Sequence, residues 1–111
     1  MNIYVCVKHV PDSAATITIE GKNGINEKIT FLLNPYDEHA VTEARHLKEI
    51  FPESEVIVIC LSKPEAESTL RSALAMGADR GILITTRHRH DPIMTARVLK
   101  TAIAQDGQPD L

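Results

Sequence analysis

Three short aliphatic runs alternate along the chain with longer segments whose apolar residues recur at helical spacing. The runs cover residues 3–7, 56–61 and 82–84 and are rich in Val, Ile and Leu. Such runs fit strands that are buried on both faces, as the strands of parallel sheets are. Strands that alternate with helices predict an α/β fold, in which each helix crosses over between parallel strands in the right-handed sense.

The first helix is expected to begin at Asn34-Pro35 and to end before Pro52. Asn is a favoured N-cap and Pro fits the first helical position, while Asp37 and Glu38 complement the positive end of the helix dipole. The side chains that should face the sheet are those at helical spacing along this segment. They are Ala40, Ala44, Leu47 and Phe51.

Two further helices are predicted from their boundary residues. Ser62 and Glu65, three residues apart, match a capping box, and Gly77 is placed as the C-terminal cap of the same helix. Asp91-Pro92 opens the last helix. The inward positions are expected to be Ala66, Leu70, Ala73 and Leu74 in one helix and Met94, Val98, Ala102 and Ile103 in the other.

The segment 11–33 breaks the alternation. Residues 15–19 alternate small or apolar with polar side chains, 21–24 form a Gly-rich turn cluster, and 29–33 are largely apolar again. This pattern predicts a β-hairpin excursion with a Gly-rich tip. At the other end, residues 107–111 predict a turn and the first residues of a further strand. The chain is therefore expected to be a single, incomplete domain over 1–111, and its open sheet edges predict self-association.

Composition excludes several classes of function. The net charge is −3 with mixed signs, which argues against a nucleic-acid or acidic-membrane partner. No apolar run reaches about 18 residues, so no membrane-spanning helix is expected. Cys6 and Cys60 lie in strand-like runs without metal-ligand spacing and are expected to be buried free thiols. The first residues lack the pattern of a secretion signal, which predicts a cytoplasmic location.

Candidate ligand contacts follow the predicted strands, at residues 8–12, 61–64 and 85–88. Open parallel sheets bind ligands beyond the carboxyl ends of their strands, and a helix N-terminus, here at 33–36, favours anions. No glycine-rich nucleotide fingerprint is present. Simpler explanations stay open for the individual residues: a plain helix cap for Asn34, solvated side chains for Lys8 and Lys63, a half-buried ring for Tyr36, and an exposed loop rather than a metal site for His88 and His90.

Three segments, taken together and in this order, resemble the beta subunit of electron transfer flavoprotein. They are VCVKHVPD at 5–12, NPYDEHAVTEARHLKE at 34–49 and LRSALAMGADRGILI at 70–84. The resemblance covers nearly the whole chain, which corresponds to roughly the first half of such a subunit. It implies a three-layer adenine-nucleotide-binding fold, related to universal stress proteins, with helices on both faces of a parallel sheet.

The resemblance also implies an electron carrier rather than an enzyme. Such a subunit binds AMP, or a second FAD in electron-bifurcating members, and pairs with an alpha subunit that holds the redox-active FAD and receives electrons from dehydrogenases. The implied nucleotide contacts are the backbone at Cys6, the segment Asn34, Pro35, Tyr36 and Asp37, and the strand end at Leu61. In the family a second nucleotide-binding loop would follow Leu111. Whether residues 1–111 bind a cofactor without that loop stays open. The other hypothesis is a stand-alone nucleotide-binding or assembly domain without redox function.

Overall fold

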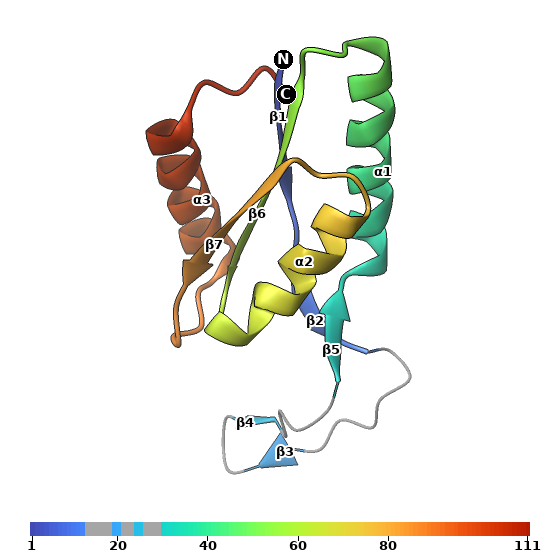
Figure 1. Cartoon of the computed structure of the whole chain (residues 1–111). Helices are drawn as coiled ribbons and strands as arrows, with labels where there is room; N and C mark the ends of the chain where they lie inside the picture. Colours follow the sequence, from blue (N-terminus) through green and yellow to red (C-terminus); the bar gives the residue numbers. More distant parts are fainter. Residues whose placement is uncertain (13–18, 21–23, 26–29) are drawn as a thin grey trace.

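The computed structural model describes residues 1–12, 19–20, 24–25 and 30–111. The three aliphatic runs form a parallel sheet with the order β1-β6-β7, built from β1 (Asn2–Cys6), β6 (Glu55–Ser62) and β7 (Arg80–Thr85) (Figure 1). Cys6 pairs with Ile59 at the carboxyl end of β1, and Leu61 pairs with Ile84 between β6 and β7. The parallel sheet predicted from the sequence is thereby confirmed.

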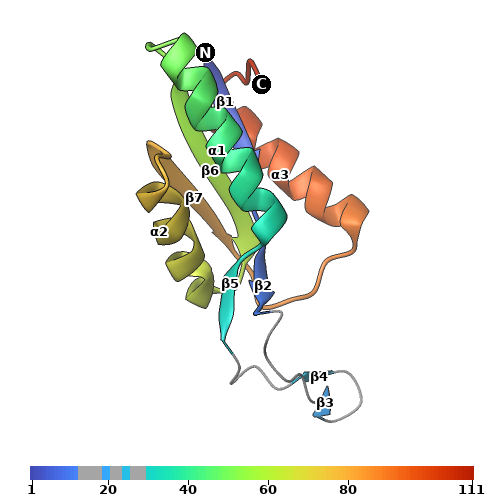
Figure 2. The same cartoon turned by 90° about the vertical axis from the view of Figure 1, so that its right-hand side faces the viewer.

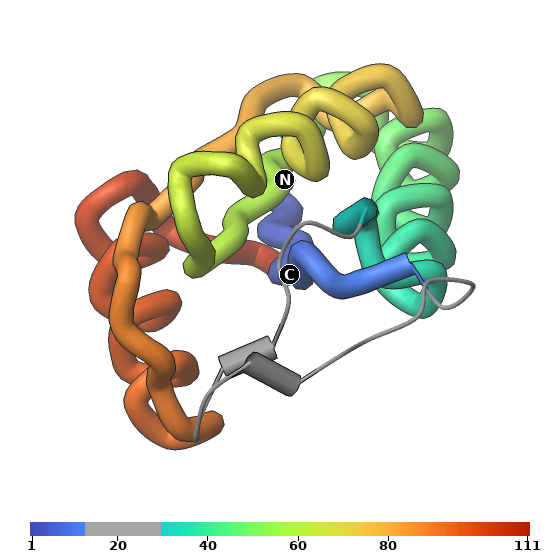
Figure 3. The backbone as a smooth tube through the Cα atoms, turned by 90° about the horizontal axis from the view of Figure 1, so that it is seen from below, coloured from blue at the N-terminus to red at the C-terminus, as the bar shows by residue number. Residues whose placement is uncertain are grey.

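Helices cover both faces of this sheet. The helices α1 (Pro35–Ile50) and α2 (Glu67–Ala75) lie on one face, and α3 (Pro92–Asp106) lies on the other (Figures 1 and 2). The view from below shows the same three layers, with the strands between α3 and the other two helices (Figure 3). No helix in the described part of the chain has the length and hydrophobicity that a bilayer crossing requires.

The core is centred on β6, whose side chains are buried on both faces. Val56, Val58 and Cys60 belong to the cluster that includes residues of α1 and α2, and each is at most 1% exposed. Ile57 and Ile59 alternate with them, point to the α3 side and are fully buried. Burying one such side chain stabilises the fold by about 1.5–3 kcal/mol, which explains why this strand is almost purely aliphatic.

The start of α1 is confirmed, but its buried stripe differs from the prediction. The side chain of Asn34 caps the helix by accepting a hydrogen bond of 3.2 Å from the Tyr36 N–H. The buried residues of the helix are Val41 and Ala44, whereas Ala40 and Phe51 are exposed. The helix is rotated so that the branched Val41, rather than the small Ala40, packs against the sheet.

The predicted capping box at Ser62 and Glu65 is wrong. Ser62 is still the last residue of β6, where its carbonyl accepts a hydrogen bond of 2.8 Å from the Thr86 N–H. A short 3₁₀ turn, η1 (Pro64–Ala66), follows before α2 begins, and no side chain caps α2. The pairing of β6 with β7 therefore extends the strand through the position that the local pattern assigned to a helix start.

The end of α2 agrees with the prediction, whereas two side chains expected to face inward do not. Gly77 lies two residues after the end of α2 and has φ +117°, a left-handed conformation that favours glycine, which confirms its predicted capping role. Leu74 and Met94, both expected to face inward, are 38% and 42% exposed. No residue of α3 is fully buried, because this helix lies alone on its face of the sheet.

The excursion between β1 and α1 is a hairpin, as predicted. Its stem pairs β2 (His9–Pro11) with β5 (Phe31–Leu33) in antiparallel fashion, and β3 (Ile19–Glu20) pairs with β4 (Gly24–Ile25). Residues 21–23 of the predicted Gly-rich tip at 21–24, residues 15–18 of the alternating stretch 15–19, and residue 29 lie outside the described residues.

The last residues run beside β1. The Leu111 N–H donates to the Asn2 carbonyl at 3.3 Å, and the Leu111 carbonyl accepts from the Tyr4 N–H at 2.8 Å. This is the hydrogen-bond pattern of a parallel pair. Residues 107–111 are not assigned as a strand, but the position agrees with the further strand expected there, on the edge of β1 that faces away from β6.

An ion-pair network fixes the end of α3 near the amino ends of the strands. Arg80 donates two hydrogen bonds of 2.7 Å to the Asp106 carboxylate and one of 2.9 Å to Glu55. The Tyr4 hydroxyl donates to the same Asp106 carboxylate at 2.6 Å. The bonds from Arg80 first, and then from Tyr4, lower the pKa of Asp106 to about 2.

We expect the stabilisation from Asp106 to disappear in acid. Because its folded-state pKa lies below the unfolded value of about 3.9, the contribution is complete above about pH 4 and is lost as the pH falls toward about 2. Asp106→Asn should therefore be less stable than the parent chain at neutral pH, with a difference that shrinks through this window. Urea unfolding followed by circular dichroism at a series of pH values measures it, and a pH-independent difference would contradict the assignment.

Candidate functional site

At Cys6, the last residue of β1, the backbone N–H and C=O groups lie at the open edge of the sheet and bond to no described strand. The register directs the N–H and C=O groups of Ile3, Val5 and Val7 toward β6, as the 2.9 Å bond from the Val7 N–H to the Ile59 carbonyl shows. The backbone groups of Tyr4 and Cys6 point to the opposite edge. Tyr4 donates there to Leu111, while within the described residues neither the N–H nor the C=O of Cys6 has a hydrogen-bond partner.

The N-terminus of α1 is attached to the segment that follows β1. The Asn34 N–H donates to the Lys8 carbonyl at 3.0 Å, and the Lys8 N–H donates to the Asp37 carboxylate at 2.8 Å. These two bonds place the segment 34–37 directly beside the carboxyl end of β1. Two of the regions predicted to contact a ligand, Cys6 and residues 34–37, are therefore brought together.

The first N–H groups of α1 are bonded within the helix start itself. The Tyr36 N–H donates to the Asn34 side chain at 3.2 Å, and the N–H groups of Asp37 and Glu38 donate to the Asn34 carbonyl at 2.9 and 3.1 Å. Pro35 has no N–H. An anion could use the positive field of the helix end, but it would find no unbonded donor in this first turn.

Exposure separates the predicted site residues. The Tyr36 side chain is 84% exposed, so the half-buried ring considered for it is wrong. Cys6 is also exposed, contrary to the expectation of a buried thiol, because at this sheet edge its side chain lies on the opposite face from the buried Val5 and Val7, whereas Cys60 in the central strand is buried. Leu61 is half-buried at the carboxyl end of β6, one strand away from Cys6.

A shallow groove of about 330 Å³ runs along the open edge of β1, beneath α1. Cys6 lies on its strand side, Ala40 and Leu47 line its helix side, and Leu111 lies across it. A volume of this order is at the lower end of the range for small-molecule sites. The groove gives a ligand at the Cys6 backbone an apolar surface on which to lie.

Sequence reasoning missed a contact between the hairpin stem and α2. The Nδ1 atom of His9 shares a hydrogen bond of 2.6 Å with the Thr69 hydroxyl, and the His9 ring stacks on Phe31 with centroids 4.9 Å apart. Burial lowers the pKa of His9, and Lys63 adds to this while Glu65 opposes it. His9 and Thr69 are 60 residues apart, so no local pattern could have paired them.

The two cysteines should differ sharply in reactivity. Burial raises the pKa of Cys60 to about 11, and its side chain is only 1% exposed, so little thiolate is available. Desolvation, with Asp37 adding to it, also raises the pKa of Cys6, but this thiol is accessible. In the folded protein a disulfide reagent should modify one thiol, and Cys6→Ser should remove that reaction. Equal labelling of both thiols before unfolding would contradict the structure.

A metal site at His88 and His90 gains no geometric support. His90 contacts the carbonyl of His88 at 3.1 Å through Nδ1. In the part of the chain that the structure describes, no three His, Cys, Asp or Glu side chains are grouped in a way that could hold a metal ion.

Comparison with known proteins gives one consistent family. The family model described as "Electron transfer flavoprotein domain" matches residues 14–111. The chain is 38% identical, over its whole length, to a protein of Bradyrhizobium diazoefficiens named "Electron transfer flavoprotein subunit beta", of which it covers 45%. It is 40% identical over 96% of its length to "Protein FixA" of Sinorhizobium fredii, of which it covers 38%.

A third relative is named for a role in a larger enzyme. "Acryloyl-CoA reductase electron transfer subunit gamma" of Anaerotignum propionicum is 34% identical over 96% of this chain and is covered over 41% of its own length. The chain thus spans less than half the length of each of these three relatives.

Proposed function

The chain belongs to the electron transfer flavoprotein family, and from this we propose that it supplies the nucleotide-binding part of a beta-type electron-carrier subunit. In this proposal the subunit binds AMP, or a second FAD, and pairs with an alpha subunit that carries the redox-active FAD. The pair would take electrons from dehydrogenases and pass them to an acceptor. The flavin supplies the redox chemistry, and the subunit itself acts as a carrier rather than as an enzyme.

The observation that carries the nucleotide proposal is the unpaired backbone of Cys6. Adenine presents an amino donor beside a ring-nitrogen acceptor, and a residue at a strand edge presents a carbonyl acceptor and an N–H donor. The Cys6 N–H and C=O point away from β6, at the carboxyl end of a parallel strand, where ligands of open α/β sheets bind. The thiol of Cys6 has no part in this recognition.

The segment 34–37 would enclose the nucleotide on its second side. Asn34 and Asp37 fix the helix start against the Lys8 backbone, which keeps the positive end of α1 near the Cys6 edge. The exposed ring of Tyr36 is available to lie against an adenine or ribose face. Pro35 shapes the turn and Leu61 forms the neighbouring strand end. In this arrangement Asn34 is both a helix cap and part of the binding site.

We also propose a cytoplasmic location. Both cysteines are free thiols, which agrees with a reducing compartment.

Purification of the protein as its gene encodes it, co-expressed with its candidate alpha subunit, tests the carrier proposal. We expect the two chains to elute together, with the visible absorption of bound flavin and with AMP or FAD released on denaturation. The alpha subunit expressed alone is the control, because it shows how much flavin binds without the beta-type chain. A colourless beta-type chain that elutes without a second subunit would overturn the proposal.

A further inference from the structure

The segment 87–100, called here the basic segment, has a charge opposite to that of the whole chain. It contains four of the 12 Lys and Arg residues but only one of the 15 Asp and Glu residues, although the net charge of the chain is −3. Its positive residues are Arg87, Arg89, Arg97 and Lys100. The positive charge is thus concentrated on the loop after β7 and the first turns of α3, at the carboxyl end of the sheet (Figure 1).

Most of this charge is not neutralised within the molecule. Arg87 pairs with Glu65 at 3.3 Å across a well exposed contact. Among the described residues no carboxylate lies within ion-pair distance of Arg89, Arg97 or Lys100. By contrast, Arg71 and Arg80 both pair with acidic side chains. The basic segment therefore holds three exposed cations, Arg89, Arg97 and Lys100, that pair with no carboxylate among the described residues.

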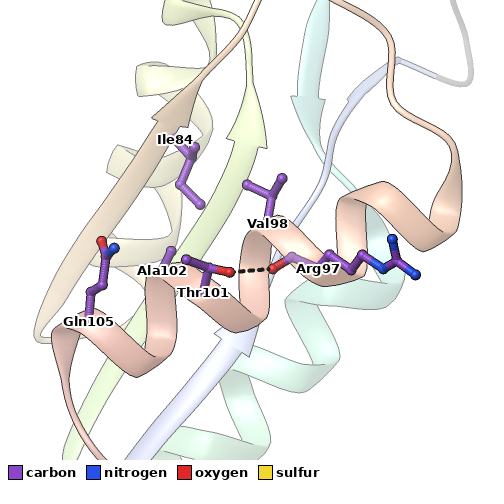
Figure 4. Close-up of a pocket in the computed structure, with 6 residues that line it drawn as sticks. All are labelled: Ile84, Arg97, Val98, Thr101, Ala102 and Gln105. Carbon is purple, nitrogen blue, oxygen red and sulfur yellow. Dashed lines mark hydrogen bonds between the residues drawn. The ribbon is translucent and has the colours of Figure 1, made fainter.

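The same segment carries apolar groups that the described fold leaves uncovered. Ile93 is 66% exposed and Met94 is 42% exposed, both in the first turn of α3. A groove of about 330 Å³ opens between α3 and β7. Ile84, Val98 and Ala102 form its apolar part, and Arg97, Thr101 and Gln105 line it along the helix (Figure 4).

Helical spacing joins these two features into one surface. Met94, Arg97, Thr101 and Gln105 follow one another at intervals of three or four residues, so they lie along one flank of α3. Met94 thus extends the apolar groove by one turn, and Arg97 stands between the two parts. In Figure 4 the Arg97 side chain extends away from Ile84, along the outside of the helix.

We propose that the basic segment and the groove between α3 and β7 dock an acidic protein surface that presents an apolar anchor. Arg and Met are enriched in protein interfaces, and an apolar groove beside unpaired cations complements an acidic segment with one or two large aliphatic side chains. The proposal is independent of the nucleotide site, since it uses none of the residues at the Cys6 edge.

A protein partner fits this surface better than a nucleic acid or an anionic membrane. Polyanions require an extended positive field, and here four cations lie on a chain whose remaining charge is negative. Membrane attachment through surface charge uses clusters of about four to eight cations without a groove to fill. The groove, with its apolar floor, indicates a partner that inserts a side chain.

The test uses a fluorescent synthetic helical peptide with a stripe of Leu flanked by Glu as the probe. Binding to the whole chain is followed by fluorescence anisotropy, first at about 0.05 M and then at about 0.5 M salt. We expect saturable binding that weakens about tenfold or more at the higher salt concentration and in Arg97→Glu. Peptides in which Glu is replaced by Lys, or Leu by Ser, should bind much more weakly.

Matched variants on α2 separate this surface from general charge and hydrophobicity. Arg71→Glu makes the same charge change at an exposed arginine and should leave peptide affinity within about twofold, because Arg71 lies outside the patch. Met94→Ser should weaken binding, whereas Leu74→Ser, at a residue of similar exposure, should not. Circular dichroism confirms that each variant is folded.

Three results would overturn the proposal. One is absence of peptide binding at low salt, and another is an equal loss of affinity in Arg71→Glu and Arg97→Glu. The third is tighter binding of a DNA duplex or of phosphatidylserine vesicles than of the peptide, which would assign the surface to a polyanion or to a membrane. None of these results bears on AMP or flavin binding, so failure here is distinguishable from failure of the carrier proposal.

Discussion

Ile57→Ala is expected to lower the free energy of unfolding by about 3–4 kcal/mol. Ile57 is fully buried in the central strand, where it packs between the sheet and α3. Removing its branched chain forfeits the burial energy and leaves a cavity, because the paired strands on both sides hold the backbone in place. Urea unfolding followed by circular dichroism measures the change.

Ile50→Ala is the control for this substitution. Ile50 ends α1 and is 68% exposed, so the same change should alter stability by no more than about 0.5 kcal/mol. A small effect at Ile57, or similar effects at the two positions, would show that α3 does not cover its face of the sheet as described.

Gly77→Ala should destabilise the fold by about 1–3 kcal/mol. Gly77 has φ +117°, where an L side chain is strained. A Cβ atom there would also lie 2.8 Å from the Arg45 Cδ, so the Arg45 side chain must move. The turn connects α2 to β7, and any relaxation of it shifts the strand that forms the edge of the sheet.

Gly81→Ala provides the contrast for Gly77. Its added Cβ would meet Val58 and Leu70 at ordinary contact distances of 3.5 and 3.6 Å, and its φ is not in the left-handed range. We expect a change of no more than about 0.5–1 kcal/mol in either direction. If thermal unfolding of the two variants shifted equally, conformational strain at Gly77 would not be the cause.

The sequence predicted the features that local chemistry determines. The aliphatic runs identified the three parallel strands, but burial on both faces holds only for the central strand β6. In β1 the buried residues alternate with partly exposed ones, and no residue of β7 is fully buried, because both are edge strands. Asn34 and Asp91 marked two helix starts, since each side chain accepts a backbone hydrogen bond at the first turn. Gly77 identified a positive φ for the same local reason.

The errors arose where contacts between distant segments decide the outcome. Ser62 resembled a helix cap, but its carbonyl bonds to Thr86 of the neighbouring segment and keeps it in β6. Cys6 lies in an apolar run like Cys60, but it is exposed because it lies on the edge strand and on the opposite face from the buried Val5 and Val7, whereas Cys60 is buried in the central strand. Strand order and the cover of each face, which the residues of one run do not encode, separate the two.

The candidate site was predictable in part. The rule that ligands bind at the carboxyl ends of parallel strands pointed to this edge, where the structure brings Cys6 next to residues 34–37. Two features could not be predicted from the sequence. The direction of the Cys6 backbone follows from the strand register, and the contact of His9 with Thr69 follows from the position of the hairpin stem. Both depend on residues far apart in the sequence.

We propose that the carboxyl end of β1 and the N-terminus of α1 together recognise the adenine of a nucleotide. Titration of the ¹⁵N-labelled chain with AMP, followed through amide chemical shifts, tests this recognition, with ribose 5-phosphate as the control that lacks adenine. We expect saturable shifts at Cys6, Lys8 and Tyr36 with AMP, and none at Cys6 with the control. Unchanged amides at these residues in millimolar AMP, or equal shifts with ribose 5-phosphate, would contradict it.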